Sequence, residues 1–324
     1  MVESATDPPA SPRPRLTRKA ESADSSKAFV KRIVVLGDTH YYHLAVAPWR
    51  LAGKRFFGQA NLYFNRRRHF DRSLLAEVVA HAVSVEPDLL VLTGDLTTTA
   101  LAGEFDDVLE ILAPLTSDTE TIVVPGNHDR YTFMSSLTST FERRLGSLST
   151  SCFPHWRAIT DRWSVLALDS AVPRFVTSRG LIDQPQLEMA KGLVRSLDDR
   201  SGLIIVCHYP FIVPPGIHWR SSHRLAKATD LEEMVRQVAD STAQCLYLHG
   251  HIHQPWWWQP SHDGLRNLTM INAGSPSRKD HQYPVGQGFW QIDLPEQPSD
   301  PFALIHHVPA MSNGGWTWTA NQVC

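Results

Sequence analysis

Residues 33–40 read IVVLGDTH, and this stretch decides the fold class. Its first half, Ile33 to Leu36, is a short β-branched run that ends at Gly37, which is typical of a buried strand. Two later stretches have the same design: LLVLTGD over residues 89–95 and TIVVPGN over residues 121–127. In each case polar residues follow the apolar run directly. We therefore expect three strands with Asp38, Asp95 and Asn127 just beyond their carboxyl ends.

Helical patterns separate these three runs. Residues 71–86 and 105–112 carry apolar side chains at helical spacing, and Pro87 ends the first of the two helices. Strand–helix–strand alternation predicts βαβ units and a largely parallel sheet, which makes this an α/β protein. In such sheets, ligands bind beyond the carboxyl ends of the strands.

The second half of the chain predicts more strands. We expect them at 163–168, 203–206 and 245–248, with a helix at about 230–240. Four further strand-like runs, at 256–258, 268–271, 289–292 and 303–307, are separated by turns, so we expect them to be antiparallel. Residues 31–310 then form one domain with two packed sheets. Residues 1–30, rich in Pro, Ser and charge, predict a disordered tail, and residues 311–324 a C-terminal tail.

Composition narrows the function classes. The formal net charge of -2 argues against a general nucleic-acid binder, so no nucleic-acid partner is expected. None of the four cysteines forms a CxxC pair, which disfavours a cysteine zinc site and favours a reducing compartment. No run approaches the ~20 apolar residues that span a bilayer, and no apolar segment follows the N-terminal arginines as in a secretory signal. We expect a cytoplasmic protein.

Five polar motifs follow strand-like runs along the chain. They are Asp38-Thr39-His40, Gly94-Asp95, Gly126-Asn127-His128-Asp129, His208 and Gly250-His251-Ile252-His253. Residues two apart in an extended segment point to the same side, so Asp38 with His40, and His251 with His253, would each present two ligands to one place.

The motifs supply seven candidate metal ligands: Asp38, His40, Asp95, Asn127, His208, His251 and His253. Seven ligands are too many for one ion and suit two. Nitrogen and oxygen ligation without thiolate fits Mn, Fe, Zn or Co. Two adjacent ions form a site for hydrolysing phosphate esters. His249 precedes the last motif, and we expect it to be a strand-end residue rather than a ligand.

The ordered set of motifs (DxH, GDx, GNHD, H, GHxH) resembles the calcineurin-like metallophosphoesterase superfamily from Ile33 to about Gly274. The run TGDLT at 93–97 and the separate GHxH are most similar to the branch with bacterial cyclic-nucleotide phosphodiesterases and UDP-diacylglucosamine hydrolases of lipid A synthesis. The resemblance implies a four-layered α/β/β/α sandwich. It also implies a hydrolase of phosphoric ester or pyrophosphate bonds that uses two divalent ions, Mn, Fe or Zn.

The resemblance also implies a role for each motif residue. Asp38, His40 and His253 would hold the first ion; Asn127, His208 and His251 would hold the second; Asp95 would bridge both. A water or hydroxide between the ions would attack the phosphate. The catalytic residues would be His128, which meets the phosphate or the leaving group, and Asp129, which would orient His128.

A long insertion at residues 44–70 follows the first motif. Its run KRFFGQANLYFNRRR at 54–68 mixes aromatic and basic side chains. Three interpretations stay open: a membrane-surface element with arginines on anionic headgroups, a cap that holds acyl chains or a diphosphate, and a helical insert packed on the core. The first would place the protein at the inner face of the membrane.

Two substrate classes compete within the phosphoesterase hypothesis. One is a membrane-proximal or lipid-linked molecule such as a UDP-acylated sugar, which the insert favours; the other is a cyclic nucleotide. A non-catalytic scaffold of the same fold is disfavoured because all seven ligands and His128 are present. A nuclease is disfavoured by the net charge. The sequence leaves the oligomeric state open.

Overall fold

The computed structural model describes residues 29–42, 70–148, 150, 152–174, 177–261, 264–312 and 315–324. The expected disordered tail therefore lies outside the described residues except for Phe29 and Val30, which begin the first strand instead. The insertion at 44–70 also lies outside them except for Phe70. None of the described helices has the length and apolar character needed to span a bilayer.

The described strands form two six-stranded sheets and one two-stranded ribbon. Strands of the first sheet are β1 (Phe29–Leu36), β2 (Leu89–Leu92), β3 (Glu120–Val123), β12 (Phe289–Pro295), β13 (Ala303–Ser312) and β14 (Gly315–Gln322). Strands of the second sheet are β4 (His155–Ala158), β5 (Trp163–Leu168), β7 (Gly202–Cys207), β9 (Gln244–His249), β10 (Trp256–Trp258) and β11 (Leu268–Asn272). The ribbon pairs β6 (Gly180–Leu181) with β8 (Leu225–Ala226). The sheet orders are β14-β13-β12-β1-β2-β3 and β10-β11-β9-β7-β5-β4.

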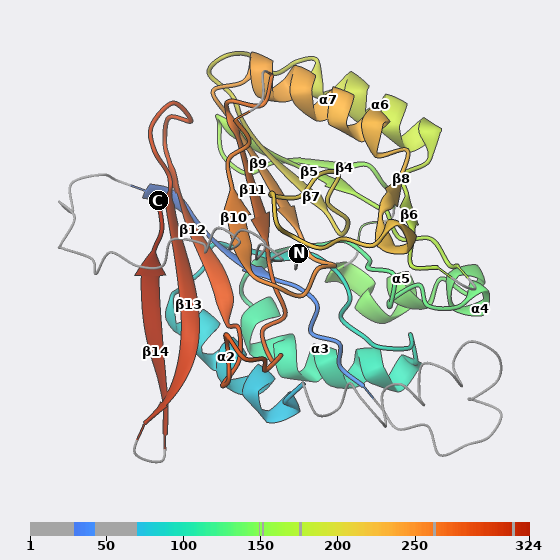
Figure 1. Ribbon diagram of the computed structural model, residues 1–324, viewed down its shortest axis with the longest axis vertical. Helices are drawn as coiled ribbons and strands as arrows, with labels where there is room; N and C mark the ends of the chain where they lie inside the picture. Colours follow the sequence, from blue (N-terminus) through green and yellow to red (C-terminus); the bar gives the residue numbers. More distant parts are fainter. Residues whose placement is uncertain are drawn as a thin grey trace, which may run out of the picture.

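Helices cover the outer face of each sheet. The helices are α2 (Arg72–Ser84), α3 (Ala102–Thr116), α4 (Phe133–Leu137), α5 (Thr140–Leu145), α6 (Gln184–Val194) and α7 (Ala228–Ser241). Helices α2 and α3 pack on the first sheet, and α6 and α7 pack on the second, with the two sheets face to face between them (Figure 1). This arrangement confirms the predicted α/β/β/α sandwich.

Strand β1 shows why its sequence is apolar at every position. Ile33 and Val35 pack into the core between the two sheets. Val34 and Leu36 point the other way and pack against α2 and α3. All four side chains are buried. A strand covered on both faces needs no polar alternation, which is the pattern of parallel sheets in layered α/β folds.

The structure differs from the sequence-based expectations at the C-terminal end. Residues 311–324 are not a tail, because β13 reaches Ser312 and β14 pairs with it in continuous antiparallel register. The indole of Trp318 stacks on the imidazole of His81 in α2, with ring centroids 4.3 Å apart. The alternation of Trp and Thr at 316–319 was the strand signal that the prediction overlooked.

Two further differences concern the second sheet. Strand β11, which we expected to be antiparallel, runs parallel to β9, because the chain turns back through β10 and then lies beside β9 in the same direction. Helix α6 was not predicted. It begins at an N-cap, Asp183, whose carboxylate accepts a hydrogen bond from the amide of Gln186 at 2.8 Å.

The parallel strands position the polar motifs. Strands β1, β2 and β3 are parallel in the first sheet, and β5, β7, β9 and β11 are parallel in the second. The first three motifs follow β1, β2 and β3, and the last two follow β7 and β9. The carboxyl ends of strands from both sheets therefore supply the polar residues of one site.

Candidate metal centre

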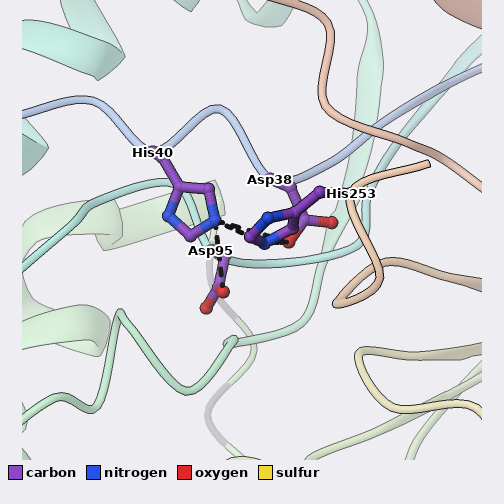
Figure 2. Close-up of side chains that lie close together, drawn as sticks. All are labelled: Asp38, His40, Asp95 and His253. Atoms are coloured by element: carbon purple, nitrogen blue, oxygen red, sulfur yellow. Dashed lines mark hydrogen bonds and ion pairs between the residues drawn. The ribbon is translucent and has the colours of Figure 1, made fainter. Parts of the chain in front are cut away.

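One group of potential metal ligands contains Asp38, His40, Asp95 and His253 (Figure 2). The Nε2 atoms of His40 and His253 are 2.7 Å apart. Asp38 Oδ1 lies 3.2 Å from His253 Nε2 and 3.7 Å from His40 Nε2, and Asp95 Oδ2 lies 3.7 Å from the same atom of His40. These four side chains converge on one point with lone-pair atoms of the kind that bind divalent metals.

A second group contains Asp95, His208 and His251, so Asp95 belongs to both groups. Asp95 Oδ2 lies 3.5 Å from His208 Nε2. The amide oxygen of Asn127 completes this group: Oδ1 lies 3.3 Å from His208 Nε2 and 3.0 Å from His251 Nδ1. The structure thus brings together all seven predicted ligands as two adjacent groups that share one carboxylate.

Backbone carbonyls fix the tautomers of the second group. The Nδ1–H of His208 donates to the carbonyl of Thr93 at 2.8 Å, and the Nε2–H of His251 donates to the carbonyl of His223 at 2.8 Å. Because a carbonyl can only accept, the opposite ring nitrogen, which faces Asn127, carries the lone pair when each histidine is neutral. Outer hydrogen bonds of this kind orient metal-binding histidines. No local motif in the sequence points to the carbonyl of His223.

Two buried carboxylate oxygens of the candidate ligands lack hydrogen-bond partners in the described part of the chain. Among the described residues, neither Asp38 Oδ1 nor Asp95 Oδ2 receives a hydrogen bond, although both atoms are buried. Buried carboxylate oxygens normally have a partner, so two such atoms facing histidine nitrogens fit a site for divalent cations.

Protons compete with metal at this centre. Burial alone would lower the pKa of His208, but the negative charges of Asp95 and Asp38 raise that pKa to about 9. A protonated imidazole cannot bind a metal. Metal binding at the second group must therefore displace a proton and weakens as the pH falls.

The backbone at the ligands is not extended, contrary to our expectation. Asp38, His40 and Asp95 have φ of 49°, 46° and 54°, and His251 and His253 have φ of 73° and 55°. These angles lie in the left-handed region, which is uncommon for residues other than glycine. Asp38 and His40 still join the same ligand group, as their spacing predicted. His251 and His253 join different groups, so the prediction from spacing was wrong for this pair.

The chain matches a known family of phosphoesterases. A model of the calcineurin-like phosphoesterase family matches residues 31–255, which is more than half of the chain. The chain belongs to the calcineurin-like phosphoesterase family. It is therefore a phosphoester hydrolase by family. The two ligand groups of this phosphoesterase are formed by the five sequence motifs, which follow β1, β2, β3, β7 and β9.

Two relatives and one solved structure extend the comparison. A "Probable cyclic nucleotide phosphodiesterase" of Vesicomyosocius okutanii subsp. Calyptogena okutanii is 24% identical over 180 residues, 56% of this chain and 68% of the relative. A protein with the same name from Ruthia magnifica subsp. Calyptogena magnifica is 25% identical with the same coverage. A purple acid phosphatase from yellow lupin (Lupinus luteus) seeds is similar in structure, with a TM-score of 0.54 and 14% identity over 86% of this chain. The present chain covers 51% of the length of the lupin enzyme, so this similarity shows only that the two proteins share a fold.

His128 lies beside the first ligand group of the phosphoesterase. Its ring centroid is 4.7 Å from that of His40, and its ring stacks on Tyr131. The Nδ1–H of His128 donates to the carbonyl of Thr98 at 2.6 Å. Its amide donates to Asp95 Oδ1 at 2.7 Å. The ring is therefore oriented by Thr98, and Nε2 is the atom that can exchange a proton.

Asp129 differs from its predicted role of orienting His128. Both of its oxygens accept hydrogen bonds from main-chain amides: Oδ1 from Thr97 at 2.9 Å, and Oδ2 from Gly126 and Leu96 at 3.0 and 3.3 Å. The carboxylate thus joins the loop after β2 to the loop after β3. The orienting role was implied by the family resemblance, whereas here the ring of His128 is held by the carbonyl of Thr98.

His249 and the three tryptophans of β10, Trp256–Trp258, pack in or against the hydrophobic core. His249 ends β9, is buried, and its Nδ1 donates to the carbonyl of Gly250 at 2.9 Å; burial lowers its pKa to about 3. This agrees with the expectation of a strand-end residue. Trp257 packs into the core between the sheets, and Trp256 and Trp258 pack against the core under α6 and α7.

We expect Gly126→Ala to damage the centre. A Cβ at Gly126 would overlap both Oδ1 and the main-chain nitrogen of Asp95. Overpacking of this kind lowers the free energy of unfolding by about 1–3 kcal/mol. Urea unfolding of the metal-free protein would show the lower free energy of unfolding, and the measured metal content would show the damage to the metal centre.

Gly192→Ala is the matched control for this prediction. Gly192 lies inside α6, and a Cβ there meets no atom within 4 Å. Alanine in a helix interior is more favourable than glycine by roughly 0.5–1 kcal/mol, so this variant should be slightly more stable and keep its metal. Equal behaviour of the two variants would contradict the packing argument.

Proposed function

We propose that this phosphoesterase hydrolyses a phosphodiester bond with two divalent cations. Asp38, His40 and His253 would hold the first cation; Asn127, His208 and His251 would hold the second; Asp95 would bridge them. One observation carries the proposal: Asp95 Oδ2 lies 3.7 Å from an imidazole nitrogen of the first group and 3.5 Å from one of the second. Metal identity is part of the proposal, with Mn, Fe and Zn as candidates.

The chemistry divides between the cations and the chain. When bound, two such cations lower the pKa of water from 15.7 to roughly 7 and clamp the attacking and leaving oxygens of an in-line displacement. The chain would hold the cations with the carboxylates of Asp38 and Asp95, the amide oxygen of Asn127 and four imidazoles. His128, with Nδ1 committed to Thr98, presents Nε2 to donate a proton to the leaving oxygen.

A cyclic nucleotide is the first substrate class to test. The two curated relatives are both named as probable cyclic nucleotide phosphodiesterases, and each matches more than half of this chain. A phosphodiester carries one negative charge, which suits a centre whose seven ligands include only two carboxylates.

A lipid-linked pyrophosphate is the second candidate. Phe70, the described residue of the 44–70 insertion, lies beside the first ligand group. The ring of Phe70 is 5.3 Å from that of His40, and the main chain of Tyr41 pairs with Thr97. A UDP-acylated sugar would place its diphosphate at the cations. With this substrate the protein would act in the cytoplasm, at the inner face of the membrane.

Metal removal and a substrate panel test the proposal. After chelation we expect no hydrolysis, and added Mn²⁺ should restore hydrolysis of a generic aryl phosphodiester and of cyclic AMP, with two ions bound per chain. A UDP-acyl-sugar, assayed with and without detergent, represents the second candidate. Protein with two ions that cleaves none of the three substrates would favour a scaffold instead.

A further inference from the structure

The connection between β11 and β12, residues 273–288, touches the first ligand group from outside. Its buried Ser275 donates a short hydrogen bond through Oγ to the main-chain carbonyl of Asp38. These two residues are 237 positions apart in the sequence. The contact therefore ties the end of β1 to the loop that follows β11.

Gln287 forms a second contact with the same group. Its carboxamide is fully buried and bonded at both ends: Oε1 accepts from the amide of Ser275 at 2.8 Å, and Nε2 donates to the carbonyl of His253 at 3.0 Å. Nε2 also donates to Asp280 Oδ2 at 3.0 Å. Gln287 itself is held through its carbonyl, which accepts from His306 Nε2 at 2.8 Å.

The two carbonyls that receive these bonds belong to residues with left-handed backbone. Asp38 has φ of 49° and His253 has φ of 55°. Residues other than glycine keep such conformations only where their surroundings hold them. The turn of the main chain at these two positions brings Asp38 Oδ1 and His253 Nε2 to 3.2 Å from each other.

The second ligand group is held by other contacts. His208 is fixed by the carbonyl of Thr93, and His251 by the carbonyl of His223. The amide of His251 donates to Asp38 Oδ2 at 2.9 Å, while the connection's contacts described above go to Asp38 and His253.

We propose that Ser275 and Gln287 are positioning residues for the first cation. They hold the main chain of Asp38 and His253 in the conformation that aims these two ligands at one point. This inference rests on the two-cation function proposed above. It assigns to the first group a direct support that reaches the second group only indirectly, through the contact of Asp38 with the amide of His251, so the two cations should respond differently when the support is removed.

Calorimetric titration of the metal-free full chain with Mn²⁺ tests this inference. The probe variants are Gln287→Glu, which turns a donor toward the carbonyl of His253 into an acceptor, and Ser275→Ala, which removes only the hydroxyl. We expect the dissociation constant of the first cation to rise about 10- to 100-fold in either variant, and that of the second to change less than about twofold. The binding event that His253→Ala lacks identifies the first cation.

Gln186→Glu is the matched control. Gln186 is also a buried glutamine whose Oε1 accepts from a main-chain amide and whose Nε2 donates to a carbonyl, both of Asp169. It should keep both affinities even if its thermal stability falls. The inference would be overturned if the affinities for both cations fell equally, or if Ser275→Ala left both affinities unchanged. If Gln287→Glu does not fold, Ser275→Ala alone decides the question. Wild-type protein that binds fewer than two ions would instead contradict the proposed function.

Discussion

Asp95→Asn is expected to release both cations and to abolish hydrolysis. The side chain is almost completely buried, and its Oδ2 faces an imidazole of each ligand group. Asparagine keeps the volume but removes the negative charge that two neighbouring cations would share. Loss of an outer partner of a metal ligand already weakens metal binding or activity by roughly 10- to 100-fold. Loss of the shared ligand should exceed that in both metal content and kcat/KM.

Asp293→Asn provides the comparison for this prediction. Asp293 is a buried carboxylate of β12 that accepts hydrogen bonds from Arg32 and Gln291, away from the seven ligands. Its amide variant should lose stability and keep two cations, as measured by elemental analysis. Retention of both cations in Asp95→Asn would show that Asp95 is not a bridging ligand.

His128→Ala is expected to keep both cations and to lose most of its activity. The imidazole is not among the seven ligands, and its Nδ1 is bonded to the carbonyl of Thr98. Removal of a proton-transfer group typically lowers the rate about 10²- to 10⁴-fold. Turnover should therefore fall in this range for a substrate whose leaving oxygen needs a proton.

Two measurements separate this role from simple damage. A substrate with a weakly basic aryl leaving group needs little proton donation, so His128→Ala should cleave it with a smaller loss than it shows for cyclic AMP. His155→Ala, which removes a half-buried histidine of β4 that contacts Thr150, should leave both rates unchanged. Full activity of His128→Ala on both substrates would exclude the proposed role.

The sequence predicted the fold well where both faces of a strand are covered. The runs at 33–36, 89–92 and 203–206 are apolar at every position because the sheets lie between two layers of other residues. It failed at β14, where Trp316 and Trp318 alternate with threonine on an edge strand, and at α6, whose apolar face is short. The alternation at β14 is a strand signal that the prediction overlooked, whereas at α6 the weak periodicity leaves the segment to be decided by contacts with distant elements.

The sequence by itself determined which residues serve the candidate metal centre. Each motif directly follows an apolar run, and a strand that ends at a sheet edge delivers its next residues to that edge. This information is local, so the seven candidate ligands could be named without coordinates, and the family resemblance added His128 to them.

Only the tertiary structure decided how those residues are grouped and held. The sharing of Asp95 and the separation of His251 from His253, which the family resemblance implied but no local pattern showed, depend on the packing of two sheets, as does the use of Asp129 as a tie between loops. The contacts that hold the ligands, such as Ser275 on Asp38 and Gln287 on His253, join residues far apart in the sequence. A left-handed backbone at a ligand is stable only when such distant contacts hold it, and no local pattern encodes them.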